Sequence, residues 1–128
     1  MRSKFNQTAG RDYPFYVAKV AGEVVGYGYI GPFRERRAYQ FTVEDSIYLH
    51  PDKTGRGLGR LLLNKLIGAS TQRGFKQMIA LIGDSYNRVS VRLHSTSGFV
   101  HTGTLQNVGQ KVDRWLDVVV IQRSLDDK

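Results

Sequence analysis

The sequence predicts an α+β fold with α/β-like character, in which helices lie on the faces of a mixed, mostly antiparallel central sheet. Two observations support this class. First, segments with strand character outnumber helical segments. Second, after an initial hairpin, strand segments alternate with helical segments. The size and composition, 128 residues with 41% apolar and 23% charged residues, are those of a single globular domain spanning residues 1–128.

Six segments predict strands, because they are rich in β-branched and aromatic residues and are bounded by turn residues. In chain order they cover residues 15–20, 23–30, 38–49, 77–82, 99–105 and 115–122. The turn Ala21-Gly22 joins the first two segments into a hairpin, and Gly31-Pro32 ends the second. Residues 1–12 are polar and predict an N-terminal arm.

Two segments predict helices. The first covers residues 57–73, is rich in leucine and ends at Gly74, a normal glycine at a helix C-terminus. The second covers residues 87–97, has Asp84 or Ser85 as its candidate cap and ends at Gly98. This order of elements excludes a helical bundle and a doubly wound dinucleotide-binding fold.

The charge of the chain leaves two kinds of anionic ligand to consider. The chain carries 19 basic and 11 acidic residues, a formal net charge of +8. Clustered Lys and Arg would be typical of nucleic-acid binding. Here the basic residues are spread along the chain, apart from Arg34, Arg36 and Arg37, and no aromatic residues are interleaved with them. We therefore expect a site for a small polyanion and no nucleic-acid partner.

Several other kinds of site are disfavoured by composition. The absence of cysteine excludes disulfides, thiolate metal sites and a cysteine nucleophile. The three histidines are dispersed, so we expect no metal site, and we interpret His50 and His101 as structural. No signal peptide is recognisable, and no apolar run approaches the roughly 20 residues that span a bilayer. We expect a cytoplasmic protein that does not bind membranes.

The most informative segment is Thr-Gly-Arg-Gly-Leu-Gly at residues 54–59, between a predicted strand and a predicted helix. Its three glycines allow positive φ and close approach of the backbone to a ligand. Free N–H groups at a helix N-terminus bind phosphate oxygens. The spacing differs from both the Walker and the dinucleotide motifs. The segment therefore predicts a pyrophosphate site, and a glycine-rich turn without a ligand is the alternative.

This segment, followed by Asn87, Ser90, Leu93 and Gly98-Phe99, resembles the acyl-CoA loop and the second motif of the GNAT acetyltransferase superfamily. Within this superfamily, the chain most resembles the phosphinothricin and methionine sulfoximine N-acetyltransferases. The segments that carry this resemblance are residues 43–48, 82–84, 93–94, 103–105 and 114–117. The resemblance extends from about Tyr13 to the C-terminus. The resemblance implies transfer of an acetyl group from acetyl-CoA to the α-amine of a small amino acid or analogue, without a metal.

The resemblance also implies catalytic roles for two residues. Glu44 takes the place of the general base that deprotonates the ammonium group of the acceptor. His94 takes the place of the group that transfers a proton to the departing thiolate, and imidazole titrates near neutrality. The alternatives are a solvated strand residue that pairs with an arginine for Glu44, and a structural histidine for His94.

The resemblance assigns binding roles to three further segments. The backbone of Ile47, Tyr48 and Leu49 would polarise the thioester and hold the pantetheine arm. The cofactor-binding set is completed by Thr54, Gly55, Arg56, Gly57, Leu58, Gly59, Arg60 and Asn87, of which Asn87 has a helix cap as its alternative role. Arg34 and Arg36 would bind the carboxylate of the acceptor, because arginine binds carboxylates bidentately. Their alternative is a solvated charged loop.

The chain departs from the family pattern at several positions. Thr54 replaces an arginine or glutamine, Ser97 replaces a leucine, and Gln110 replaces an aromatic residue. The usual first strand and two helices are not recognisable, so the resemblance implies a truncated GNAT fold. Exposed apolar surface and a free strand edge would then favour a homodimer. The alternative function is a truncated, catalytically weak relative that binds CoA or associates with itself.

Overall fold

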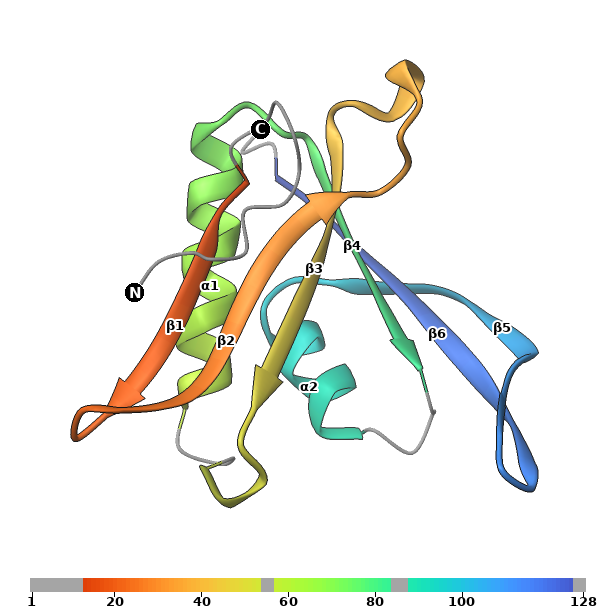
Figure 1. The fold of residues 1–128 in the computed structure, drawn as a ribbon. Coiled ribbons are helices and arrows are strands. Elements are labelled where there is room, and N and C mark those ends of the chain that lie inside the picture. The colour runs from red at the N-terminus through yellow and green to blue at the C-terminus, as the bar shows by residue number, and fades with distance from the viewer. Residues whose placement is uncertain (1–12, 54–56, 84–87, 126–128) are drawn as a thin grey trace.

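A computed structural model of the chain describes residues 13–53, 57–83 and 88–125. It contains one six-stranded sheet in the order β1-β2-β3-β4-β6-β5 (Figure 1). The strands are β1 (Phe15–Val20), β2 (Glu23–Pro32), β3 (Thr42–Leu49), β4 (Gln77–Gly83), β5 (Val100–Lys111) and β6 (Arg114–Ser124). The helices are α1 (Leu58–Gln72) and α2 (Arg88–Thr96), with short 3₁₀ turns η1 (Arg37–Tyr39) and η2 (Pro51–Lys53). The predicted α+β class is confirmed.

The sheet consists of two antiparallel halves joined by one parallel pair. Strands β1, β2 and β3 are antiparallel neighbours, as are β4, β6 and β5, whereas β3 and β4 run parallel. The parallel pairing extends only from Thr42↔Gln77 to Glu44↔Ile79. Beyond Glu44 the two strands diverge, so the halves of the sheet form an open V (Figure 1).

Two predicted strand boundaries are wrong. The third strand begins at Thr42 rather than residue 38, because residues 37–39 form the 3₁₀ turn η1. The strand predicted over 99–105 continues to Lys111, although the polar residues after Leu105 interrupt its apolar pattern. It continues because Asn107 adopts a φ of 55° within a bulge and its N–H donates to Asp117 Oδ1 at 3.0 Å. A cross-strand side chain thus extends the hairpin beyond the apolar residues.

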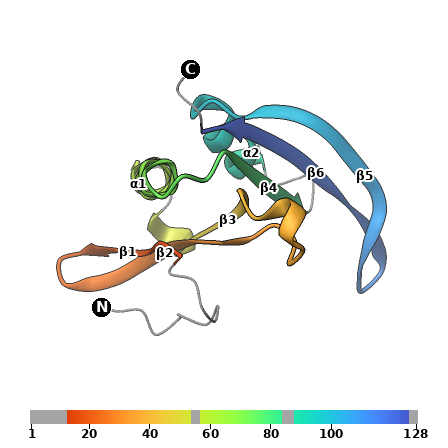
Figure 2. The same cartoon turned by 90° about the horizontal axis from the view of Figure 1, so that it is seen from above.

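Both helices lie on the same face of the sheet in the described residues (Figure 2). Helix α1 covers β1, β2 and β3, and α2 packs against β4 and the first turns of α1. The core between helices and sheet contains side chains with at most 1% exposure: Val43, Leu63, Leu66, Met78 and Ile121. In the described residues, no helix is both long and apolar enough to cross a membrane.

The alternation of β3 assigns its side chains to two faces of the sheet. Val43 and Asp45 are buried on the face that carries the helices, which places Glu44 on the opposite face. On that opposite face, aromatic rings form a continuous row across β1, β2 and β3. Its members are Phe15, Tyr27, Tyr29 and Tyr48, with centroids of neighbouring rings 5.5 to 6.2 Å apart. Tyr48 is 56% exposed, so one end of this row is open to solvent.

The close pairing of β2 with β3 predicts that any side chain at position 26 lowers the stability of the fold. A Cβ atom on Gly26 would lie 2.5 Å from Leu49 Cδ2 and 2.7 Å from the carbonyl oxygen of Tyr48. We expect Gly26→Ala to lower the free energy of unfolding by about 1–3 kcal/mol through overpacking, measured by urea denaturation. Gly31→Ala on the same strand is the matched control, because a Cβ there meets nothing within 4 Å. Equal effects of the two substitutions would contradict this account of the sheet.

Candidate functional site

The site is organised by the divergence of β3 from β4. Strand β3 pairs with β2 as far as Gly26↔Leu49, but it pairs with β4 only as far as Glu44↔Ile79. Over residues 46–49, the backbone N–H and C=O groups that point away from β2 therefore have no partner on a described strand. Such groups can bind an extended ligand in the way that an added strand binds a sheet edge.

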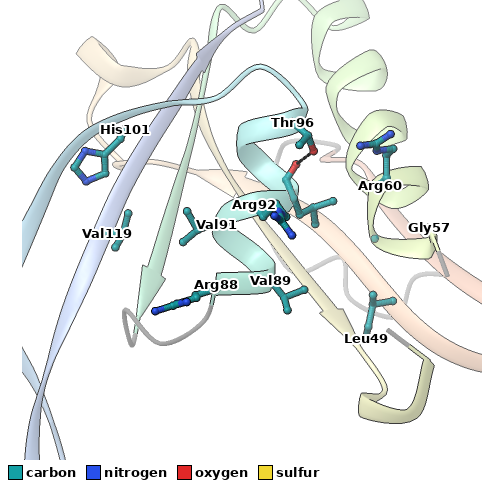
Figure 3. A pocket seen from close by; sticks show the side chains of 12 residues that line it. Leu49, Gly57, Arg60, Arg88, Val89, Val91, Arg92, Thr96, His101 and Val119 are labelled. Atoms are coloured by element: carbon teal, nitrogen blue, oxygen red, sulfur yellow. Dashed lines mark hydrogen bonds between the residues drawn. The ribbon is translucent and has the colours of Figure 1, made fainter. Parts of the chain in front are cut away.

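A groove of about 880 Å³ lies beside this divergence, on the face of the sheet that carries the helices (Figure 3). Leu49, Gly57, Gly59 and Arg60 line one side of it, and Arg92 and Leu93 of α2 line another. Its charged lining in the described residues consists of Arg60, Arg88 and Arg92, without a carboxylate. The groove therefore has the charge expected of a site for a polyanion.

The two described glycines of the predicted phosphate loop serve different purposes. Gly57 precedes α1 with a φ of 80°, a left-handed conformation that favours glycine. The N–H groups of the first turn of α1, which follows it, have no acceptor within the helix and are available to an anion. Gly59 is buried, and a Cβ on it would lie 3.2 Å from Leu93 Cδ2. Gly59 therefore lies at a close approach of α1 to Leu93 of α2.

The structure brings part of the predicted cofactor-binding set together at this groove. Leu49, Gly57, Gly59 and Arg60 line it, and Leu58 begins α1 beside them. The side chain of Ile47 packs against the core, and that of Tyr48 joins the aromatic row. The backbone N–H and C=O of Ile47 point into the divergence, whereas those of Tyr48 point towards β2. Thr54, Gly55, Arg56 and Asn87 lie outside the described residues.

Glu44 lies at the point where the strands part, on the face opposite the groove. Burial, and then the negative charge of Asp45, raise the pKa of Glu44 above its ordinary value. Its neighbour on β2 is Gly31, around which a Cβ would find open space. Glu44 is thus a half-buried carboxylate with free space beside it. A carboxyl group with a raised pKa is a stronger base than an ordinary glutamate side chain.

His94 lies between α2 and β3, with a partner for each of its ring nitrogens. Its side chain is buried, Nε2 lies 2.7 Å from Asp45 Oδ2, and Nδ1 lies 2.8 Å from the carbonyl oxygen of Ser90. Because a carbonyl only accepts, Nδ1 donates to Ser90, and with Asp45 as a carboxylate Nε2 donates as well. Burial by itself lowers the pKa of His94, but the hydrogen bond to Asp45, the charge of Asp45 and the bond to Ser90 outweigh it and raise that pKa.

Sequence reasoning missed the role of Asp45. The residue is 5% exposed, and Oδ1 has no hydrogen-bond partner among the described residues. Its bond to His94 ties α2 to β3 across the divergence. The available signal was the alternation of β3, where a carboxylate occupies a position between the apolar Val43 and Ile47. An acid at such a position needs a buried partner. No group of three or more His, Asp and Glu side chains within the described ranges is arranged to hold a metal ion.

Arg34 and Arg36 lie in the loop between β2 and β3, at the Glu44 end of β3 rather than at the groove (Figure 1). The guanidinium carbon of Arg34 lies 4.9 Å from the ring centroid of Phe33 and 5.9 Å from that of Tyr39. These cation–π contacts restrain the side chain of Arg34. Arg36 is exposed and precedes η1. Arg88 and Arg92, which line the groove, were not identified from the sequence.

Comparison with known proteins identifies the family. The acetyltransferase (GNAT) family matches residues 1–99 of the chain. The chain belongs to this family. The resemblance found in the sequence is therefore confirmed.

Three relatives are close in sequence or structure. The chain is 43% identical over 126 residues to a phosphinothricin N-acetyltransferase from Alcaligenes faecalis, covering 98% of this chain and 64% of the relative. It is 42% identical to a methionine sulfoximine/methionine sulfone acetyltransferase from Salmonella typhimurium, covering 90% and 67%. A phosphinothricin acetyltransferase from Sinorhizobium meliloti, solved in complex with acetyl-CoA, superposes with a TM-score of 0.85 at 46% identity, covering 90% and 62%. The chain thus spans about two thirds of the length of these relatives.

The environment of His94 predicts a pH-dependent contribution to stability. His94→Gln leaves the buried Asp45 without its cationic partner, so we expect a loss of about 3 kcal/mol or more at about pH 6, measured by urea denaturation. Because the folded protein raises the pKa of His94 above 6.5, this contribution is complete below that pH and is lost as the pH rises through the raised value. The difference between wild type and variant should therefore shrink as the pH is raised to alkaline values.

The control for this series is His101→Gln. His101 is exposed and bonds only the hydroxyl of Thr104 among the described residues, so its replacement should change stability by less than about 0.5 kcal/mol at either pH. A loss for His94→Gln that is the same at both pH values would contradict the charged pair.

Proposed function

We propose that this chain transfers the acetyl group of acetyl-CoA to the amino group of a small amino acid or analogue of the phosphinothricin or methionine sulfoximine/sulfone type. The observation that carries the proposal is the divergence of β3 from β4, with a cationic groove on one face of the sheet and Glu44 on the other. The substrates in the names of the relatives support the acceptor class.

The charge of the groove and the free backbone groups beside it support acetyl-CoA as the acetyl donor. The N-terminus of α1, preceded by Gly57, provides N–H groups for the pyrophosphate, and Arg60 adds positive charge. The backbone groups of residues 46–49 that point away from β2 provide donors and acceptors along the path of the pantetheine arm. Backbone N–H groups near Ile47 polarise the thioester carbonyl as the reaction proceeds. Thr54, Gly55, Arg56 and Asn87 complete this set in the proposal.

The acceptor side of the site is the face that carries Glu44. An acceptor bound there loses an ammonium proton to Glu44, and its free amine attacks the carbonyl carbon of the thioester. The new C–N bond forms as the C–S bond breaks, the nitrogen loses its extra proton to become an amide, and the leaving thiolate takes up that proton. The free space beside Gly31 gives the amine access to Glu44. Arg34 and Arg36 lie at this end of β3, where a substrate carboxylate is bound in the proposal.

The role of His94 in the proposal follows from its two hydrogen bonds. Both ring nitrogens are engaged, by Asp45 and by the carbonyl of Ser90. We therefore assign to His94 the positioning of α2 against β3 in place of the proton transfer to the thiolate that the resemblance implied, and Glu44 keeps the role of general base. The homodimer and the cytoplasmic location expected from the sequence stay predictions.

The test is the release of CoA thiol from acetyl-CoA in the presence of phosphinothricin, methionine sulfoximine, methionine sulfone and unmodified amino acids. We expect release with at least one of these acceptors. Glu44→Gln should lower kcat/KM by about 10²–10⁴, because general base catalysis contributes that factor. The dissociation constant of acetyl-CoA, measured by calorimetry, should not change.

The control is Glu23→Gln, which removes an exposed carboxylate at the start of β2 and should leave the rate unchanged. Binding of acetyl-CoA without thiol release on any acceptor would overturn the transferase proposal. That result would favour the alternative of a catalytically weak, CoA-binding relative.

A further inference from the structure

Two arginines face each other across the groove between the helices. Arg60 is in the first turn of α1 and Arg92 is in the second turn of α2, and both side chains are exposed. Figure 3 shows Arg92 on the side of α2 that is turned towards α1, and Arg60 on the side of α1 that is turned towards α2. Arg88 extends from the other side of α2 (Figure 3). The groove thus presents a pair of guanidinium groups on two separate elements.

The packing of the helices keeps this pair together. Gly59 and Leu93, the neighbours of Arg60 and Arg92 in the sequence, are in contact, since a Cβ on Gly59 would lie 3.2 Å from Leu93 Cδ2. Within the described residues, neither arginine makes a hydrogen bond or an ion pair, and no carboxylate lines the groove. Two like charges held on adjacent helices repel each other, and a bound anion removes that repulsion.

The chemistry of the ligand supplies such an anion, on the basis of the proposed function. CoA carries a pyrophosphate, which the N-terminus of α1 accommodates, and a separate phosphate monoester at the 3′ position of its ribose. A phosphate monoester bears a charge of about −1.5 to −2 at pH 7. Arginine binds phosphate through two parallel N–H···O bonds. We propose that Arg92, together with Arg60, binds the 3′-phosphate and makes the chain selective for CoA over 3′-dephospho-CoA.

The experiment compares two ligands that differ only in this phosphate. The dissociation constants of acetyl-CoA and 3′-dephospho-acetyl-CoA are measured by calorimetry for wild type, Arg92→Gln and Arg60→Gln. For wild type we expect acetyl-CoA to bind about 10- to 100-fold more tightly, as charge-assisted hydrogen bonds predict. Arg92→Gln should reduce this preference to less than about threefold, mainly by weakening the binding of acetyl-CoA, because its partner phosphate is absent from the other ligand.

The remaining outcomes decide between the two proposals. Arg73→Gln removes the same charge at the opposite end of α1 and should keep the wild-type preference. If Arg92→Gln weakens both ligands equally, or if wild type binds both equally, the 3′-phosphate site is overturned and CoA binding stands. If wild type binds neither ligand, the proposed function and the phosphate site are both overturned. Circular dichroism of each variant checks that the exposed substitutions leave the fold intact.

Discussion

The loss of pairing between β3 and β4 after Glu44 is the constraint on which the site depends. A parallel pair that continued to Leu49 would satisfy the backbone of residues 46–49 within the sheet. Because the strands part instead, that backbone is available to a ligand, and the sheet opens between the face with the helices and the face with Glu44. The cofactor and the acceptor can therefore approach the same point from opposite faces.

Contacts from outside the sheet are needed to keep β3 and β4 apart after Glu44, since the two strands could otherwise continue to pair or shift in register. The structure uses α2 for this purpose, and the hydrogen bond from His94 to Asp45 at 2.7 Å ties the helix to β3 just beyond the last paired residue. The contact of Gly59 with Leu93 ties the same helix to α1. Burial of Glu44, and then the negative charge of the adjacent Asp45, raise the pKa of Glu44, so the residue that bonds His94 also affects the proposed base.

Much of the fold and part of the site could be predicted from the sequence. Strand and helix order followed from β-branched segments and glycine boundaries, and the groove residues Leu49, Gly57, Gly59 and Arg60 followed from the glycine loop together with the family resemblance. The reason for Gly59 could not be predicted, because helix packing depends on Leu93. The partner of Asp45 is His94, which lies 49 residues away in the sequence. No pattern in the neighbouring residues indicates this pair, or the burial of the ring nitrogens of His94. Arg92 was missed because its position opposite Arg60 depends on tertiary structure.

Amide hydrogen exchange of residues 46–49, with and without saturating acetyl-CoA, tests the central claim most directly. Amides of β3 that point towards β2 are protected in the sheet, and those that point into the divergence should exchange quickly in the free protein. If the pantetheine arm binds this segment, acetyl-CoA should slow exchange at these fast amides and leave the amides of β1 unchanged. Tight binding of acetyl-CoA with unchanged exchange at residues 46–49 would contradict the account.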